Sequence, residues 1–369
     1  MSRHPETRSN PRLFQYLGSV LTLAAILATG TPVISPAAQT TSNATQAEID
    51  IAALSGTIRG SGSTFADRYY KAVISGLAKS AKGVTINYRP IGSGRGKSEF
   101  GQGLTDFAGT DSTVKATDGP KLGEFMYVPT TAGAIAVVYR LNGVDDLKLS
   151  ATTVAKIFQR DIRRWNDPAI SADNPDTRLP NKSIGIVHRS DRSGTTSNFT
   201  KYLTLAAPKT WRLGSGDAIK WPAASTQGDG NFGLAQIISN NNGSIGYIDL
   251  ANANAFDLTT VAIKNKAGTY VRPTSVGVTA SLSQITVNAD LTYQPLDADG
   301  PASYPITAPT FALIRTTYRD RQTADLVAGF LTYVLNDGQD TAVRTDYARL
   351  PEAWRRQALA QLDKITVTP

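Results

Sequence analysis

One short segment of this chain carries several side chains suited to binding an anion. Residues 188–196 read HRSDRSGTT. They combine a guanidinium, a carboxylate, two hydroxyls and a glycine: Arg189, Asp191, Ser193, Thr195 and Gly194. Arginine presents a planar fork of N–H donors that matches an oxyanion, and free backbone N–H groups at a helix start favour negative charge. The segment suggests a site for a tetrahedral oxyanion, and a polar surface turn closed by its own Arg189–Asp191 pair is the alternative.

Two further stretches place small hydroxyl residues at an expected helix start. They are Ser63-Thr64-Phe65 and Ser93-Gly94. Each of them alone is ordinary helix capping. A strand-like run at residues 105–111 ends on an isolated carboxylate, Asp111. Three such helix starts with one arginine and Asp111 could form a shell around a single small anion.

The sequence lacks the residues that most phosphate enzymes need. The stretch GSGRGKS at residues 92–98 has three residues, not four, between its first glycine and the Gly-Lys pair, so it is not a P-loop. His188 is the only histidine beyond the N-terminal region, and no G-x-S-x-G motif surrounds Ser93 or Ser193. We predict no enzymatic activity, no catalytic residue, no metal and no cofactor. The alternative is a secreted phosphate-ester hydrolase that uses these two serines and His188.

Composition describes a globular, basic protein. The chain has 369 residues, with 41% hydrophobic and 18% charged residues, which predicts more than one core and hence two lobes. The formal net charge of +8 favours anionic partners. Lys and Arg are spread without a dense run, so nucleic acid is not an expected partner. The chain has no cysteine, so we expect no disulfide and no lipid-modified cysteine.

The N-terminal region has the pattern of an export signal. Arg3, Arg8 and Arg12 precede an apolar run at residues 17–28, and small residues and prolines follow. This order is typical of a cleaved signal peptide. We expect residues 1–44 to be an export signal and a loose leader, and the protein to be periplasmic and not a lipoprotein.

Strand-like and helix-like patterns alternate along the rest of the chain. Continuous apolar runs at residues 132–140 and 306–314 are typical of strands buried on both faces. Helical spacing marks residues 69–78, 152–165, 232–239 and 325–335. Such alternation predicts an α/β fold with mostly parallel sheets flanked by helices, in which ligands bind at the carboxyl ends of strands.

Several motifs together resemble the PstS family, the phosphate-binding proteins of bacterial ABC phosphate uptake. The motifs are GSGSTF at 60–65, IGSGRG at 91–96, DFAGTD at 106–111, KIFQRDIRRWNDPAI at 156–170, HRSDRSGTTSNFTKYL at 188–203, KWP at 220–222, GSIGYID at 243–249, YPITAPTFALI at 304–314 and DYARLPEA at 346–353. The resemblance runs from about Gly56 to Gln357. It implies an exported protein that captures inorganic phosphate and delivers it to the permease and ATPase of an ABC transporter.

The resemblance also implies a set of site residues. Matched by position, the phosphate ligands are Thr64, Phe65 through its backbone N–H, Ser93, Asp111, Arg189, Ser193, Gly194 through its backbone, and Thr195. Asp191 would orient Arg189 from behind. Two residues depart from the family pattern: Arg95 and Arg192 stand where small residues are usual. We favour the interpretation that both point to solvent at the mouth of the cleft.

The implied fold is the two-lobed, type II periplasmic binding protein, with the ligand cleft between the lobes. Residues 52–136 and 306–369 would form lobe 1, which is discontinuous in sequence, and residues 137–305 would form lobe 2. The two long apolar runs would cross between the lobes and act as the hinge. We expect a monomer. Transport and phosphate sensing remain open alternatives for what the closed form docks to.

Asp111 makes the expected ligand specific. A phosphate ion keeps at least one proton near neutral pH, because its second pKa is about 6 to 7. Asp111 can accept the hydrogen bond of that proton, whereas fully ionised sulfate has no proton to donate. Sites built around one such bond reject analogues that lack it by factors on the order of 10⁴. We therefore expect phosphate and arsenate to bind and sulfate to be rejected.

Overall fold

The computed structural model describes residues 50–368, so the predicted export segment lies outside the described residues. Within this range the largest sheet has ten strands. They are β1 (Ser55–Gly62), β2 (Gly83–Pro90), β3 (Phe107–Thr110), β4 (Phe125–Arg140), β6 (Gly185–Arg189), β7 (Thr226–Gly228), β8 (Ser244–Asp249), β9 (Thr259–Thr260), β12 (Thr307–Arg315) and β14 (Tyr347–Ala348). The main path is β2-β1-β3-β12-β4-β8-β6-β7, and β9 and β14 also pair with β4.

The sheet is mixed, so the prediction of mostly parallel sheets is wrong in this respect. β1 is parallel to β2 and β3, and β6 is parallel to β7 and β8. The long strands β4 and β12 are antiparallel to each other, and each is also antiparallel to its other neighbours. A continuous apolar run indicates burial on both faces but carries no information about strand direction.

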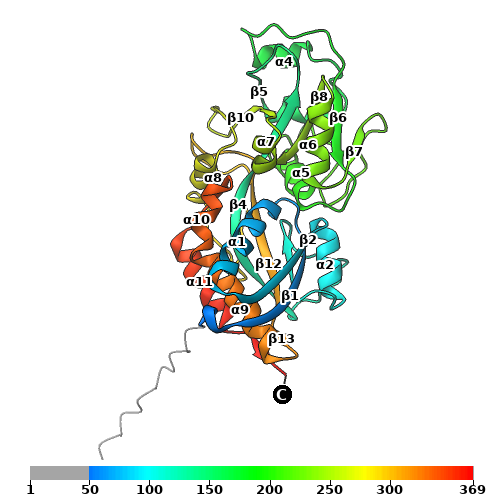
Figure 1. Ribbon diagram of the computed structural model, residues 1–369. Helices are drawn as coiled ribbons and strands as arrows, with labels where there is room; N and C mark the ends of the chain where they lie inside the picture. The colour runs from blue at the N-terminus through cyan, green and yellow to red at the C-terminus, as the bar shows by residue number, and fades with distance from the viewer. Residues whose placement is uncertain (1–49, 369) are drawn as a thin grey trace, which may run out of the picture. The chain divides into compact units, whose positions relative to one another are not determined.

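Strand β4 joins the two ends of this sheet. Its residues 125–134 pair with β12, and its residues 135–140 pair with β8. Figure 1 shows β12 near the lower part of β4, in the half of the molecule that holds β1 and β2, and β8 and β6 near its upper part. Both predicted apolar runs are confirmed as strands, since 132–140 lies in β4 and 306–314 coincides closely with β12. Nearly every residue of the two strands is buried.

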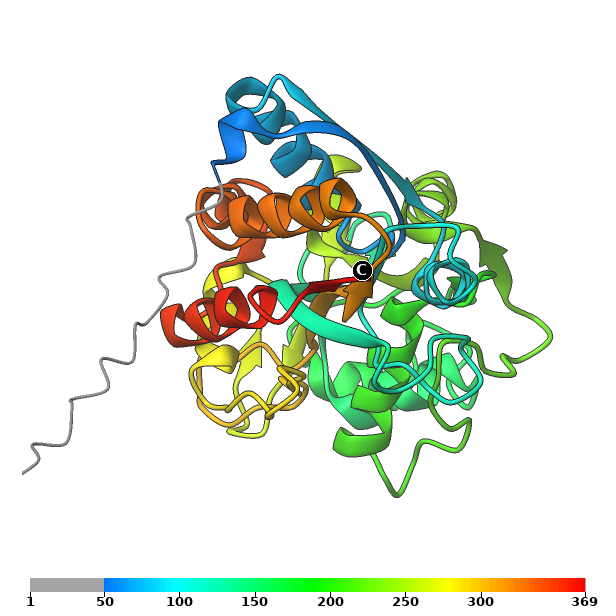
Figure 2. The ribbon, with the colours of Figure 1, turned by 90° about the horizontal axis from the view of Figure 1, so that it is seen from below.

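Helices cover the sheet. They are α1 (Asp67–Ser80), α2 (Ser93–Gly101), α3 (Ala151–Phe158), α4 (Pro168–Asp173), α5 (Gly194–Ala206), α6 (Gly230–Asn240), α7 (Leu250–Ala255), α8 (Ser275–Leu282), α9 (Arg321–Leu335), α10 (Gly338–Arg344) and α11 (Glu352–Leu362), with a 3-10 helix η1 (Ile51–Ala53). In Figure 2, α9 and α11 lie side by side; α9 packs on β1 and β4, and α11 packs on β4. None of the helices within residues 50–368 is long and apolar enough to cross a membrane.

Two small sheets complete the fold. One contains β5 (Lys148–Leu149), β10 (Ala262–Lys264) and β11 (Tyr270–Val271), and the other contains β13 (Thr317–Tyr318) and β15 (Thr366–Val367). The helix predicted over 152–165 ends at Phe158. Arg160 has a φ of 65°, and this left-handed backbone cannot continue a right-handed helix.

Candidate anion-binding site

The first strand-to-helix turn follows β1. Ser63 Oγ accepts a hydrogen bond from the Ala66 N–H and so closes the turn immediately before α1. The Ser63 N–H donates to the Gly109 carbonyl at 2.8 Å, which holds this turn against the end of β3. Gly62 has a φ of 134°, and a Cβ there would collide with the Gly109 carbonyl oxygen. Glycine is therefore needed for β1 and β3 to approach closely at the site.

Asp111 lies at the end of β3, where the first two turns meet. Ser63 Oγ donates to its carboxylate at 2.6 Å, and Ser93 Oγ at the start of α2 donates to Oδ2 at 3.1 Å. The side chain is buried. Burial raises the pKa of Asp111 to about 6, although the hydrogen bonds from serine hydroxyls and the charge of Arg189 act in the opposite direction.

Arg189 is the last residue of β6, and its guanidinium makes four hydrogen bonds to other side chains. Nε and Nη2 each lie 2.6 Å from one carboxylate oxygen of Asp191, a bidentate pair. Nη1 donates to Asn231 Oδ1 at 2.7 Å and to Thr195 Oγ1 at 3.3 Å. The Arg189 side chain is 1% exposed. Asp191 thus holds two of the three guanidinium nitrogens of Arg189.

The start of α5 lies against Asp111 and the start of α2. Ser193 Oγ accepts from the Thr196 N–H at 3.1 Å and caps the helix. A Cβ on Gly194 would collide with Ser93 Oγ and lie 2.8 Å from Asp111 Oδ2. The first residue of α5 therefore touches the start of α2 and Asp111 at once.

Thr64 and Phe65 occupy the remaining side of the site. Thr64 Oγ1 is buried and has no hydrogen-bond partner within the described residues, although buried hydroxyls are normally satisfied. Phe65 is held in place by its buried ring, which packs edge-on against Tyr347, and the Tyr347 hydroxyl donates to the Phe65 carbonyl. The hydroxyl of Thr64 therefore keeps hydrogen-bonding capacity for a further partner.

Asn231 is the site residue that sequence reasoning missed. It lies in the first turn of α6, is buried, and accepts from Arg189. Its Nδ2 lies 3.4 Å from Thr195 Oγ1. The stretch QGDGN at residues 227–231 ends on Asn231 and gave only a weak signal, because it places a polar residue after glycines at another helix start. No spacing in the sequence related Asn231 to Arg189.

The two unusual arginines have different environments. Arg95 is 68% exposed and lies 3.4 Å from Glu99, which agrees with the solvent-facing interpretation. Arg192 is 48% exposed, but its Nη2 lies 2.6 Å from Asp118 Oδ1, and the Asp118 side chain is completely buried. Arg192 is therefore held by an ion pair to the segment between β3 and β4 that contains Asp118.

The surroundings of His188 differ from those expected of a catalytic base. Its ring stacks on Trp221, and Nδ1 lies 3.0 Å from the Arg189 carbonyl oxygen. Burial lowers the pKa of His188 despite that hydrogen bond. Within residues 50–368, no group of three or more His, Cys, Asp or Glu side chains could hold a metal ion.

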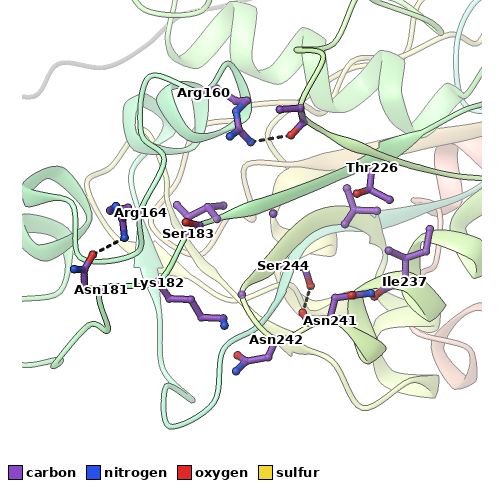
Figure 3. Close-up of a pocket in the computed structure, with 15 residues that line it drawn as sticks. Arg160, Arg164, Asn181, Lys182, Ser183, Thr226, Ile237, Asn241, Asn242 and Ser244 are labelled. Carbon is purple, nitrogen blue, oxygen red and sulfur yellow. Dashed lines mark hydrogen bonds between the residues drawn. The ribbon is translucent and has the colours of Figure 1, made fainter.

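Two surface cavities differ in their relation to these residues. A cavity of about 790 Å³ is lined by Thr64 and Asn231 and reaches Arg68 and Asp229, so it borders the site. A second cavity of about 660 Å³, drawn in Figure 3, is lined by Arg160, Arg164, Asn181, Lys182 and other residues. None of the predicted site residues lines it. We call this second cavity the basic groove.

The fold is that of a periplasmic binding protein. A solved structure of a high affinity periplasmic phosphate-binding protein, PfluDING, bound with phosphate, superposes with a TM-score of 0.69 at 20% sequence identity and covers 85% of this chain and 100% of that chain. A family model described as a PBP superfamily domain matches residues 26–338.

Curated relatives define the family more closely. Phosphate-binding protein PstS 3 of Mycobacterium leprae is 34% identical over 314 residues, covering 81% of this chain and 84% of the relative. Phosphate-binding protein PstS of Xylella fastidiosa is 35% identical over 279 residues, covering 74% and 76%. The chain belongs to the PstS family of phosphate-binding proteins, and the predicted family is confirmed.

Proposed function

We propose that this protein captures inorganic phosphate and delivers it to the permease and ATPase of an ABC transporter. The observation that carries the proposal is the convergence of Ser93, Gly194 and Arg189, from two strand-to-helix turns, with Asp111 at the end of β3. PstS proteins are non-enzymatic solute-binding proteins, so the prediction that the chain is not an enzyme is confirmed by family membership. The periplasm is the corresponding compartment, reached through the predicted signal peptide.

Each group has a distinct task in the proposed complex. Arg189 supplies charge-assisted hydrogen bonds to one or two phosphate oxygens. Asp191 fixes the plane of the guanidinium, so that these donors keep one direction. The hydroxyls of Thr64, Ser93, Ser193 and Thr195 and the N–H groups of Phe65 and Gly194 donate to the remaining oxygens. Asp111 accepts the hydrogen bond of the phosphate proton. Sulfate would face the same carboxylate without a proton to share, which is the basis of rejection.

Closure of two lobes over the anion accompanies binding in this proposal. Lobe 1 comprises residues 52–136 and 306–369, and lobe 2 comprises residues 137–305. The change of partner within β4, from β12 to β8 after residue 134, supports a boundary at this point. Bending of β4 and of the chain near the start of β12 would then open the cleft.

Titration calorimetry of the exported protein with phosphate, arsenate and sulfate tests the function. Phosphate and arsenate should bind and sulfate should not. A protein that binds sulfate as tightly as phosphate would contradict the role of Asp111. A chromogenic phosphate ester, with and without divalent metal, separates binding from the hydrolase alternative, because turnover is expected only from an enzyme.

A further inference from the structure

Four charged side chains near the candidate site form one connected cluster. Lys97 Nζ lies 2.7 Å from Asp118 Oδ2 and 2.9 Å from Asp217 Oδ2. Arg192 Nη2 lies 2.6 Å from the other oxygen of Asp118. We call Lys97, Asp118, Arg192 and Asp217 the clasp. Its formal charges cancel, which lets a buried cluster exist without a net charge in the interior.

Most of the clasp is buried. The side chains of Lys97 and Asp118 are 0% exposed, and that of Asp217 is 6% exposed. Burial alone would raise the pKa of Asp118, but hydrogen bonds from Lys97, from the Lys115 backbone and from Arg192 outweigh burial and lower that pKa. Asp118 is therefore ionised at neutral pH, and both its cationic partners are attracted to it.

Three members of the clasp, Lys97, Arg192 and Asp217, are attached to segments that carry the anion site. Lys97 lies one helical turn after Ser93 in α2, and it also donates to Ser112 Oγ, directly after Asp111. Arg192 precedes Ser193, and its carbonyl accepts from the Gly94 N–H at 2.9 Å. The Asp217 carbonyl accepts from the Ser193 N–H at 2.8 Å. The clasp thus contacts the starts of α2 and α5 and the residue after Asp111, and none of its members is a proposed ligand.

We propose that the clasp holds the two lobes closed over the bound anion and thereby sets its residence time. This inference rests on the proposed function and on the proposed lobes. Lys97 and Asp118 belong to residues 52–136, whereas Arg192 and Asp217 belong to residues 137–305. Two ion pairs therefore cross from one lobe to the other, Lys97–Asp217 and Arg192–Asp118. Both must break before the anion can leave.

The clasp can also open without leaving its lysine unpaired. Lys97 keeps Asp118, a residue of its own lobe, while Arg192 and Asp217 become hydrated when the lobes separate. Asp217 Oδ1 is buried without a hydrogen-bond partner among the described residues, so the closed cluster is not fully satisfied. An incompletely satisfied closed state favours release over permanent closure.

Asp217→Asn tests the clasp, because it removes one ion pair between the lobes and leaves Lys97 paired with Asp118. We expect phosphate to dissociate about tenfold faster in stopped-flow measurements, with an association rate within about threefold of the wild type. The matched control is Asp299→Asn. It removes the same charge from the same lobe, at an exposed carboxylate that pairs with Lys266, and should leave the dissociation rate unchanged.

A measurement without phosphate separates the clasp from the proposed function. The Gly94 amide bonds across the lobes to Arg192, whereas the Gly96 amide bonds within the same lobe to Gly92. In this proposal the phosphate-free protein also visits the closed state, in which the clasp protects the Gly94 amide. Asp217→Asn should therefore accelerate hydrogen exchange at Gly94 relative to Gly96 in the phosphate-free protein. Faster exchange in a protein that fails to bind phosphate would reject the function and retain the clasp. Unchanged exchange, or an unchanged dissociation rate in a protein that binds phosphate, would overturn the clasp.

Discussion

Two regions of this molecule present arginine in contrasting ways. Arg189 is buried and uses its guanidinium on Asp191, Asn231 and Thr195. In the basic groove, Arg160 donates to the Ala224 carbonyl and Arg164 donates to Asn181 Oδ1, both at the surface (Figure 3). A buried guanidinium fixed by a carboxylate can recognise one anion geometry, whereas solvated arginines attract anions of many kinds weakly. Burial and fixed orientation, more than positive charge, distinguish the candidate site.

Asp111→Asn should produce the largest change in anion selectivity, because it removes the buried carboxylate of the candidate site. The lining of the basic groove has no carboxylate. An amide can donate to a sulfate oxygen and carries no negative charge. We expect the ratio of phosphate to sulfate affinity to fall by on the order of 10³ or more, with only a modest loss of phosphate affinity. Calorimetry with both anions measures the ratio. Asp229→Asn, at an exposed carboxylate beside the site, is the control that should leave it unchanged.

Arg189→Lys should follow in size. Lysine keeps the charge but loses the fork that binds Asp191 and Asn231 together. Phosphate affinity is expected to fall about a hundredfold or more. The same substitution at Arg164 in the groove should change affinity less than about twofold. Equal losses of phosphate affinity at Arg189 and Arg164 would show that burial and fixed orientation do not distinguish the two regions.

Acid should weaken selectivity through Asp111, whose pKa burial raises to about 6. Above this pH the carboxylate is ionised and repels sulfate, and below it the neutral carboxyl can donate a hydrogen bond. Sulfate affinity should therefore rise as the pH falls, by about tenfold at pH 5 relative to pH 7. Sulfate titrations from pH 5 to pH 8 measure this. Asp111→Asn should abolish the dependence, and a persisting dependence would assign it to another group.

The basic groove should contribute least. Arg164→Ala combined with Lys182→Ala removes two of its cations. At low salt the association rate of phosphate should fall by less than about twofold through weaker steering, and the effect should disappear near physiological ionic strength. Stopped-flow measurements at two salt concentrations test this. A large loss of equilibrium affinity would show that the groove belongs to the binding machinery.

The helix and strand patterns were largely readable from the sequence. The stripe of α1 and the two long apolar strands follow from local periodicity, and the start of α5 follows from capping by Ser193. The direction of β4 and β12 did not follow, since burial of both faces leaves the same pattern in either direction. The end of α3 at Phe158 depended on one left-handed residue, Arg160, that helical spacing does not reveal.

The sequence by itself determined the kinds of donor and acceptor in the site and, through its motifs, the family. Only the tertiary structure decided which of them meet. Ser63 reaches Asp111 across 48 positions, and Arg189 reaches Asn231 across 42. Arg192 pairs with Asp118, which is 74 positions away in the sequence, and the pair connects two segments of the fold. Such pairings depend on how strands and turns pack together, because local spacing sets which face a side chain occupies but not what lies opposite that face.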